Sequence, residues 1–366
     1  MFGASMKRAK IHDCVAVSAV ISSVFVLTQV VYAEEFKPYL QSQTVLQVGP
    51  ATLNSQLIAD RPSEVMYGST QSEMGVEKGN IRIGGLYRQE YQLIPNADTA
   101  DYFYATEKSH KLTPGRTYQI SLEKTVFEAK GLHVTRSFQP TNQLNIAVGA
   151  SVLQAFGLQK GTLSGKAVAS KKGKTHSYNV KLDYQYSADE LLDRPDVQSP
   201  DGLGYSVDAQ LHWQPNTKLN VEVYAQDLLG AIHWSDVPYT TGQLTSNVKS
   251  VDEDGFVTYN PHLTGREGYK SSMRQSLQPK VDVQAHYRLN QRGNAVILSA
   301  KHLPEADYWG VGGKWPLKKG TLQASIWPQT KMLNMGFSNK RVDVNIGTDG
   351  LKVSDMHALW VSVGLH

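Results

Sequence analysis

Two histidines each stand four residues after an aspartate, and these pairs are the nearest approach to a catalytic couple in the sequence. They are Asp208 with His212 and Asp282 with His286. On a β-strand, residues four apart share a face but lie about 13 Å apart, too far for a direct hydrogen bond. The sequence has no Gly-x-Ser-x-Gly nucleophile motif, phosphate-binding loop, dinucleotide fingerprint or zinc spacing. It therefore predicts a protein that is not an enzyme.

A run of acids at Asp252-Glu253-Asp254, followed by Gly255, is the clearest candidate cation site, because calcium takes clustered carboxylates. The longer liganding pattern of a calcium loop is missing, so a solvated acidic turn explains the run better. Cys14 is the only thiol, and it precedes a long apolar run near the N-terminus. The rest of the chain has no cysteine for a disulfide, a metal or nucleophilic chemistry. We expect no metal and no cofactor.

The first 33 residues have the layout of an export signal. Lys7, Arg8 and Lys10 give a positive start, residues 15–31 are almost wholly apolar, and cleavage is predicted after Ala33. A transmembrane anchor is the alternative, but an apolar run of about 17 residues is short for a helix that spans a bilayer. Without this segment the formal charge falls from +4 to about +2. A chain so near neutrality is not predicted to bind nucleic acid.

From about residue 80 onward, apolar and polar residues alternate with a period of two, which indicates β-strands with two different faces. The clearest segments are 178–186, 205–213, 219–225 and 281–289. Short polar connections with Gly or Pro separate several strands, so neighbouring strands are expected to be antiparallel. These connections are 171–173, 214–217, 290–293 and 318–320. Two longer connections are predicted at 187–203 and 229–279, and the second has room for a hairpin of its own.

Alternation alone does not separate a membrane barrel from a soluble β-sandwich, but the spacing of the aromatic residues does favour the barrel. Tyr205 and Trp213 lie eight residues apart on one face, which is about 26 Å along a strand. That distance fits the ~25 Å apolar band between the aromatic girdles of outer-membrane barrels. The predicted girdle residues are Tyr178, Tyr186, Tyr205, Trp213 and Tyr287.

The polar faces of the same strands carry charges in mid-strand, which a water-filled lumen tolerates. If the apolar rows face lipid, these polar residues project inward. The predicted lumen-lining residues are Lys181, Asp183, Asp208, His212, Glu222, Asp282, His286, Arg288 and Asp343. Both signs of charge occur among them. Opposed charges across a lumen narrow a conducting pore or cross-link a closed interior, and the sequence leaves both readings open.

With these features, the chain resembles the outer-membrane β-barrel proteins of Gram-negative bacteria over residues 80–366. The last strand fits, because its apolar row of alternate residues runs to Leu365, although His366 is out of phase with it. The resemblance implies an all-β, antiparallel, up-and-down transmembrane barrel of 12–16 strands, with 14 favoured at about 20 residues per strand and connection. In size the chain is similar to fatty-acid-transporter-like barrels, whose N-terminal segment plugs the lumen.

Three segments are therefore expected. They are a signal peptide at 1–33, an N-terminal periplasmic or plug segment at 34–79, and a barrel at 80–366. We expect the protein in the outer membrane, with lipid and the barrel-assembly machinery as partners and small solutes as cargo. The main functional hypothesis is a pore or transporter. The alternatives are a non-conducting scaffold or assembly partner, and a soluble periplasmic sandwich that binds a ligand.

Overall fold

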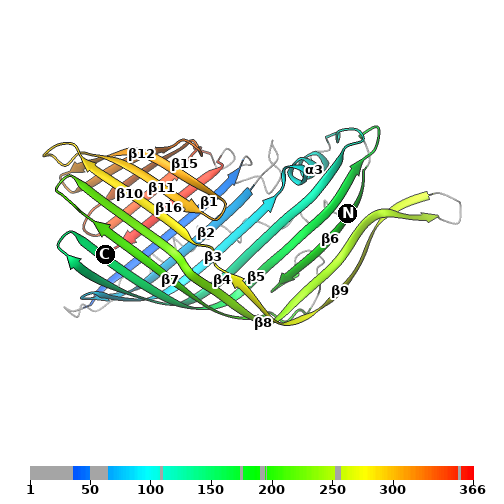
Figure 1. The fold of residues 1–366 in the computed structure, drawn as a ribbon, viewed down its shortest axis with the longest axis horizontal. Coiled ribbons are helices and arrows are strands. Elements are labelled where there is room, and N and C mark those ends of the chain that lie inside the picture. Colours follow the sequence, from blue (N-terminus) through cyan, green and yellow to red (C-terminus); the bar gives the residue numbers. More distant parts are fainter. Residues whose placement is uncertain are drawn as a thin grey trace.

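A computed structural model shows an all-β chain with one described helix (Figure 1). It describes residues 36–49, 65–107, 110–173, 176–189, 194, 196–251, 257–352 and 356–366. The predicted signal peptide and the acidic run at 252–254 lie outside these residues. Within them, no helix is long and apolar enough to cross a membrane.

Fourteen of the described strands pair in an antiparallel ring that closes between β1 and β16. This closure confirms the predicted barrel and its favoured strand number, and it shows that the sandwich alternative is wrong. The ring strands are β1 (Lys37–Gly49), β2 (Val65–Lys78), β3 (Ile81–Pro95), β4 (Thr117–Thr141), β5 (Leu144–Ala169), β7 (Asp201–Trp213), β8 (Leu219–Val251), β10 (Lys280–Arg288), β11 (Ala295–Leu303), β12 (Ala306–Leu317), β13 (Gly320–Trp327), β14 (Met332–Ser338), β15 (Val342–Thr348) and β16 (Ala358–Leu365).

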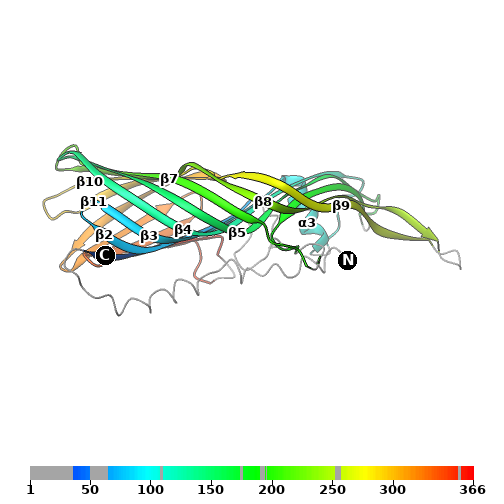
Figure 2. The ribbon, with the colours of Figure 1, turned by 90° about the horizontal axis from the view of Figure 1, so that it is seen from below.

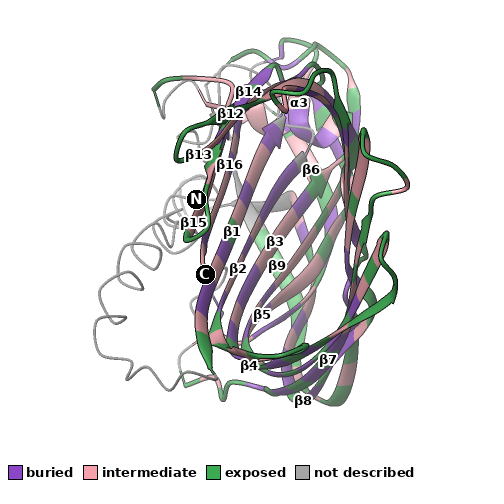
Figure 3. Cartoon of the chain, turned by 90° about the vertical axis from the view of Figure 1, so that its left-hand side faces the viewer, coloured by how far each residue is buried: buried purple, intermediate pink, exposed green. Residues whose placement is uncertain are grey.

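The alternation in the sequence determines which way each strand faces. On β7, Leu203 and Tyr205 are exposed on the outside, whereas Ser206 and Asp208 are buried on the inside. Figure 3 shows buried and exposed residues alternating along the strands in the same way. Large apolar side chains such as Leu132 and Leu298 remain exposed on the outer face. An outer face this apolar is what a lipid-facing barrel requires.

Two barrel strands, β1 and β2, lie inside the segment 34–79, so the prediction of a separate periplasmic or plug segment there, with a barrel that starts only at residue 80, is wrong. The two strands pair with each other over 13 residue pairs, and their outer edges pair with β16 and β3. Their outward faces carry hydroxyls, such as Ser42 bonded to Ser72 and Thr44 bonded to Thr70. Because these hydroxyl residues interrupt the apolar residues of the outward rows, neither strand shows the clean apolar alternation that predicts a strand.

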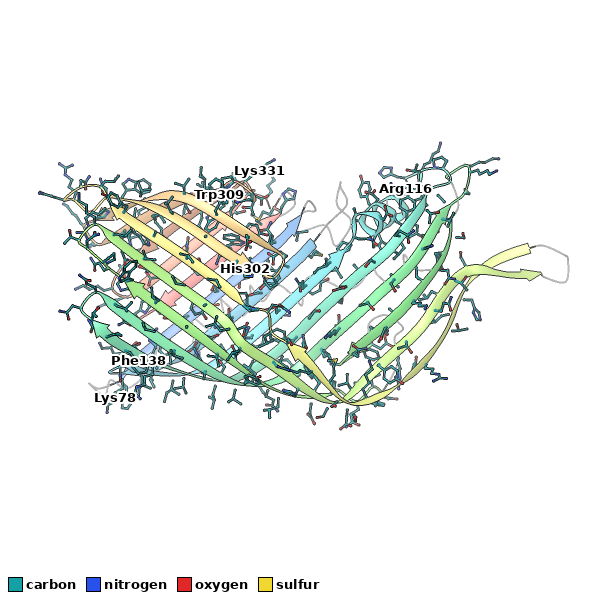
Figure 4. The ribbon with its side chains drawn as sticks, viewed as in Figure 1. Lys78, Arg116, Phe138, His302, Trp309 and Lys331 are labelled. Carbon is teal, nitrogen blue, oxygen red and sulfur yellow. The ribbon has the colours of Figure 1, made fainter. Side chains whose placement is uncertain are left out.

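The barrel has two different ends. At the end that we call the turn end, β1 begins and β16 finishes, and short reverse turns join the strands. The turns predicted at 214–217, 290–293 and 318–320 all lie there, whereas the turn at 171–173 lies at the opposite, loop end. In Figure 4, Lys78 and Phe138 mark the turn end, and Arg116 marks the loop end.

At the loop end, one side of the barrel wall continues into a tall sheet that we call the flap. It consists of the distal parts of β4, β5 and β8 together with two further strands, β6 (His176–Tyr186) and β9 (Val257–Ser276). Figures 1 and 2 show it reaching well beyond the shorter wall of β10–β16. The connection predicted at 229–279 is thus mostly the β8–β9 hairpin.

The single described helix, α3 (Ala97–Glu107), covers one face of the flap. Its N-terminus is capped because the Asn96 side-chain oxygen accepts a hydrogen bond of 2.8 Å from the Thr99 amide. The helix buries Tyr102 and Ala105 in an apolar cluster with flap strands. The strand residues of that cluster include Tyr118, Ile120, Ala167, Val180, Leu182 and Leu244.

Candidate functional site in the barrel lumen

A bulge in β8 turns an acidic side chain into the lumen. The pairing of β7 with β8 shifts register between Val207 and Ala209, where β8 carries extra residues. Asp227 lies in this bulge with a φ of 57°, in the left-handed region that Asp tolerates better than most residues. The bulge therefore points both Gln226 and Asp227 inward, where each finds a partner across the lumen.

Asp227 is the centre of a buried ionic network. Arg88 of β3 donates two hydrogen bonds to its carboxylate, at 2.8 Å and 2.6 Å, in the bidentate geometry that Arg favours. The Lys280 ammonium lies 2.8 Å from the same carboxylate, and the Ser206 hydroxyl donates to it at 2.7 Å. The side chains of Asp227 and Arg88 are only 0% and 4% exposed, so this pairing is shielded from water.

The network crosses the lumen rather than following the wall. Arg88 and Asp227 come from β3 and β8, which β4, β5 and β7 separate in the ring. Lys280 of β10 also binds Glu90 of β3 at 2.6 Å. The amide of Gln226 donates to the Gln71 side chain of β2 at 2.5 Å. Side chains of β2 and β3 therefore meet those of β8 and β10 directly.

A second branch of the network runs toward the turn end. Asp208 accepts a hydrogen bond of 3.0 Å from the Asp227 amide, and His133 Nε2 lies 3.5 Å from its other oxygen. The His133 Nδ1 atom is 2.8 Å from Glu73, and Glu73 also accepts a hydrogen bond from the Tyr39 hydroxyl. Five strands thus contribute to one continuous chain of buried polar contacts.

Two apolar clusters fill the lumen on either side of these charges. The first packs Trp234 against side chains of β3, β4 and β5, and its indole donates to Gln275 at 2.9 Å. The second gathers aromatic side chains near the loop end of the short wall. It contains Val45, Tyr67, Leu303, Tyr308, Trp327, Met332, Ala358 and Trp360. Together, the clusters and the network occupy the interior of the barrel at this level.

This arrangement can hold charge, bind a polar solute or block a path. Within the described residues, no group of three or more His, Cys, Asp or Glu side chains is placed to bind a metal ion. The two Asp and His pairs noted in the sequence also remain apart. Asp282 instead contacts Lys301 of the neighbouring strand, and Asp208 belongs to the lumen network.

Seven of the predicted lumen residues lie on the inward rows of ring strands. Asp208 is the member of this set that joins the central network. His286 is buried with both ring nitrogens unpaired, and Asp343 binds His366 at 2.7 Å. That contact explains why His366 is out of phase with the apolar row of β16, since it belongs to the inward row. The remaining inward residues are His212, Glu222, Asp282 and Arg288.

The other two predicted lumen residues, Lys181 and Asp183, lie on β6 of the flap, which is outside the ring. Both are exposed beyond the barrel, so their assignment to the lumen is wrong. Tyr178 and Tyr186 alternate with them on β6, and they face the α3 side of the flap instead of lipid. The strand has the right alternation for a barrel wall, but a helix covers its apolar row.

The three remaining aromatic residues of the predicted girdle lie on the outer face of the ring. Tyr205, Trp213 and Tyr287 are all exposed there. Trp213 and Tyr287 stand near the turn end, because they are close to the last residues of β7 and β10. Trp315 and Phe337 occupy similar outward positions near the ends of β12 and β14, so aromatic side chains recur around this rim.

Sequence reasoning missed most of the central network, including Arg88, Asp227 and Lys280. Asp227 did carry a signal, because the alternation of 219–225 breaks there and two exposed leucines follow. A break in alternation within a long strand is typical of a bulge. Arg88 and Lys280 carried no such signal, since their partners Asp227 and Glu90 are 53 to 190 residues away in sequence.

No family model and no curated protein matches the sequence. The described fold is a closed antiparallel β-barrel of 14 ring strands with an apolar outer face. Among solved structures, the chain is similar to the toluene transporter TodX of P. putida, with a TM-score of 0.40, 10% identity, and 91% of this chain and 88% of that one covered. The CymD monoaromatic hydrocarbon channel has a TM-score of 0.40 and 10% identity to this chain, with 90% of this chain and 86% of that one covered. The ferric-catecholate import receptor Fiu of E. coli has a TM-score of 0.27 and 9% identity, with 87% of this chain and 65% of that one covered.

Proposed function

We propose that this chain is an outer-membrane channel for small solutes, closed in this structure by the cross-lumen network. The observation that carries the proposal is the pairing of Arg88 and Lys280 with Asp227 inside a ring whose outer face is apolar. A barrel that needs no conduit can fill its interior with apolar side chains, because buried ion pairs rarely stabilise more than a hydrophobic core does. A polar path that these side chains close explains their presence better.

The two ends of the barrel suggest its orientation. In outer-membrane barrels the short turns face the periplasm and the longer connections face outward. We therefore place the turn end in the periplasm and the flap outside the cell, after export and removal of residues 1–33. Outer-membrane lipid would surround the apolar face. The barrel-assembly machinery would recognise β16, whose outward row includes Leu359, Val361 and Val363.

Opening requires the bridging side chains to part. Arg88 of β3 and Lys280 of β10 share the carboxylate of Asp227 on β8. Displacement of Asp227 would therefore break the ion pairs of both cations at once. Lys280 would keep Glu90 as a partner, whereas Arg88 would lose its only ion pair within the described residues. A polar solute that competes for these groups would lower the cost of opening, because it replaces buried ionic contacts.

Planar-bilayer recording of the purified full-length protein tests this function. We expect a mostly closed channel with rare openings, and more frequent openings in the Asp227→Asn variant. Asp282→Asn is the matched control, because Asp282 contacts Lys301 of the adjacent strand and its bond does not cross the lumen. Silent membranes for the wild type and for Asp227→Asn, at any voltage, would refute the channel.

A non-conducting scaffold is the second candidate, and the packing of Trp234 and the aromatic cluster inside the lumen favours it. In that case the network would be a structural brace, and the flap would be the contact surface for another envelope protein. Crosslinking in intact cells separates the two candidates. A specific crosslinked partner of the flap, combined with absent conductance, would support the scaffold.

A further inference from the structure

The face of the flap opposite α3 continues the inward surface of the barrel. On β5, Leu158 packs in the lumen cluster, and the alternate residues beyond it lead up the flap on the same side. On β6 the paired residues of that side include Asn179 and Lys181. A solute approaching the loop end of the lumen would therefore meet this face, which we call the lumen-side face.

We propose that a hollow on the lumen-side face binds the phosphate group of a phosphorylated solute. The hollow measures about 300 Å³, and β5, β6 and β8 each contribute to it. Its lining residues are Ser164, Gly165, Lys166, Asn179, Lys181 and Gln243. This inference rests on the proposed function in one respect: the solute bound in the hollow would be a solute that then approaches the lumen.

The chemistry of the lining suits a phosphate. Lys166 and Lys181, which both carry an ammonium group, line the same hollow, and Ser164 adds a hydroxyl residue. The Gln243 amide donates to the Asn179 side-chain oxygen at 2.7 Å, so the Asn179 amide nitrogen is oriented as a donor. None of the six lining residues is acidic. Charge-assisted hydrogen bonds from lysines are among the stronger contacts that a phosphate oxygen makes.

The backbone holds the two lysines near each other. Ser164 pairs with Lys181 and Lys166 pairs with Asn179, so the lysines are diagonal neighbours on one face of the β5–β6 pair. A Cβ atom at Gly165 would lie 2.3 Å from the Asn179 carbonyl oxygen, so glycine is needed for this close approach. Like charges in such proximity repel, and a bound anion would relieve that repulsion.

Acidic residues on the same face do not cancel this charge. Asp183 accepts a hydrogen bond of 2.7 Å from Gln185, and the Lys270 ammonium lies 3.9 Å away from it. Among the residues that the structure describes, Glu123 on β4 is the other acid of this face. Five described cations oppose these two acids, namely Lys160, Lys166, Lys181, Arg266 and Lys270. A surplus of cations at a channel mouth concentrates anions there.

A soluble source of the phosphate fits the position of the hollow better than a lipid head group does. The lumen-side face looks over the barrel opening, whereas lipid contacts the outward face of the ring, on which Leu132 and Leu298 are exposed. A lipid-borne phosphate would have to leave its leaflet to reach Lys166. The ligand is therefore expected to be a small phosphorylated molecule in solution.

Calorimetric titration of the full-length protein in detergent with glucose 6-phosphate tests this proposal, with glucose as the uncharged probe. We expect saturable binding of the phosphorylated sugar only, weakened at least about tenfold in Lys166→Gln/Lys181→Gln. The control Lys318→Gln/Lys319→Gln removes two exposed lysines at the turn end and should bind as the wild type does. Ser164→Ala gives a milder second variant, with an expected loss of about threefold.

Equal binding by the lysine variant and the wild type would overturn the proposal, as would equal binding of glucose. Capture of the protein by vesicles containing phosphatidic acid, dependent on the same lysines and without sugar-phosphate binding, would overturn the soluble source. Because binding is measured in detergent, it does not depend on conductance. A silent bilayer with intact binding would refute the channel alone, and lost binding with intact openings would refute this site alone.

Discussion

Replacing Asp227 by Asn is the sharpest test of the network, because it removes one charge and little volume. The wild-type carboxylate is fully buried and holds Arg88 through two hydrogen bonds and Lys280 at 2.8 Å. Removing one partner of a buried ion pair typically costs about 3–5 kcal/mol, since the opposite charge stays buried without compensation. Lys280 keeps Glu90 at 2.6 Å, so most of that cost falls on Arg88.

The assay is a urea titration of the barrel folded in lipid vesicles, with tryptophan fluorescence as the signal, together with bilayer recording. We expect Asp227→Asn to lower the free energy of unfolding by about 3–5 kcal/mol and to increase openings. Adding Arg88→Met removes the stranded guanidinium and should restore at least half of the lost stability, a coupling that marks a direct interaction.

The control Asp282→Asn breaks a pair between neighbouring strands whose carboxylate is 25% exposed, so it should cost less than Asp227→Asn and should leave conductance unchanged. The reasoning is refuted if Asp227→Asn unfolds within about 0.5 kcal/mol of the wild type and opens no more often. It is also refuted if the double variant is as unstable as the sum of the single ones, because the two charges would then not be coupled.

Three further predictions follow from the fold. Leu298→Arg, in the middle of the outer face of β11, should destabilise the barrel in vesicles by about 2–4 kcal/mol, while Leu317→Arg at the turn-end rim should cost about 1 kcal/mol or less. Trp234→Ala should lower the free energy of unfolding by about 3–5 kcal/mol in the same urea titration, because it empties the centre of a buried cluster. The Gln119 amide and the Arg116 guanidinium hold the pKa of Asp98 below its ordinary value of 3.8. The ionised Asp98 carboxylate therefore stabilises the docking of α3 fully above pH 3.8, and this stabilisation is lost as the pH falls through the lowered pKa. Hydrogen exchange of residues 97–107 should accelerate over that pH range in the wild type, but not in Asp98→Asn.

The barrel was predictable because lipid and water impose opposite demands on alternate residues. That demand is visible in 205–213 and 281–289, which became ring strands with the expected faces. It is absent in β1, where Gln41 and Gln43 face inward and Ser42 and Thr44 face outward. Local alternation therefore finds a strand only where its two environments differ, and β1 and β2 were mistaken for a separate segment.

The same logic explains the error on β6. Its row of Val180, Leu182 and Tyr184 needs an apolar neighbour, but the sequence cannot distinguish a lipid from a helix. The helix that covers it is about 80 residues earlier in the chain, with a cap at Asn96 that no strand pattern reveals. Alternation therefore shows which row of side chains on a strand is apolar, and tertiary structure decides what covers that row.

The site was harder to predict than the fold because its partners are far apart in sequence. Arg88 and Asp227 meet only when the ring closes, and Asp227 points inward only because of a bulge. A left-handed Asp in a long strand is costly enough to require a compensating gain. Here the gain is two buried cations brought to one carboxylate. The bulge therefore belongs to the closing device itself, and straightening it should open the lumen as removing the charge would.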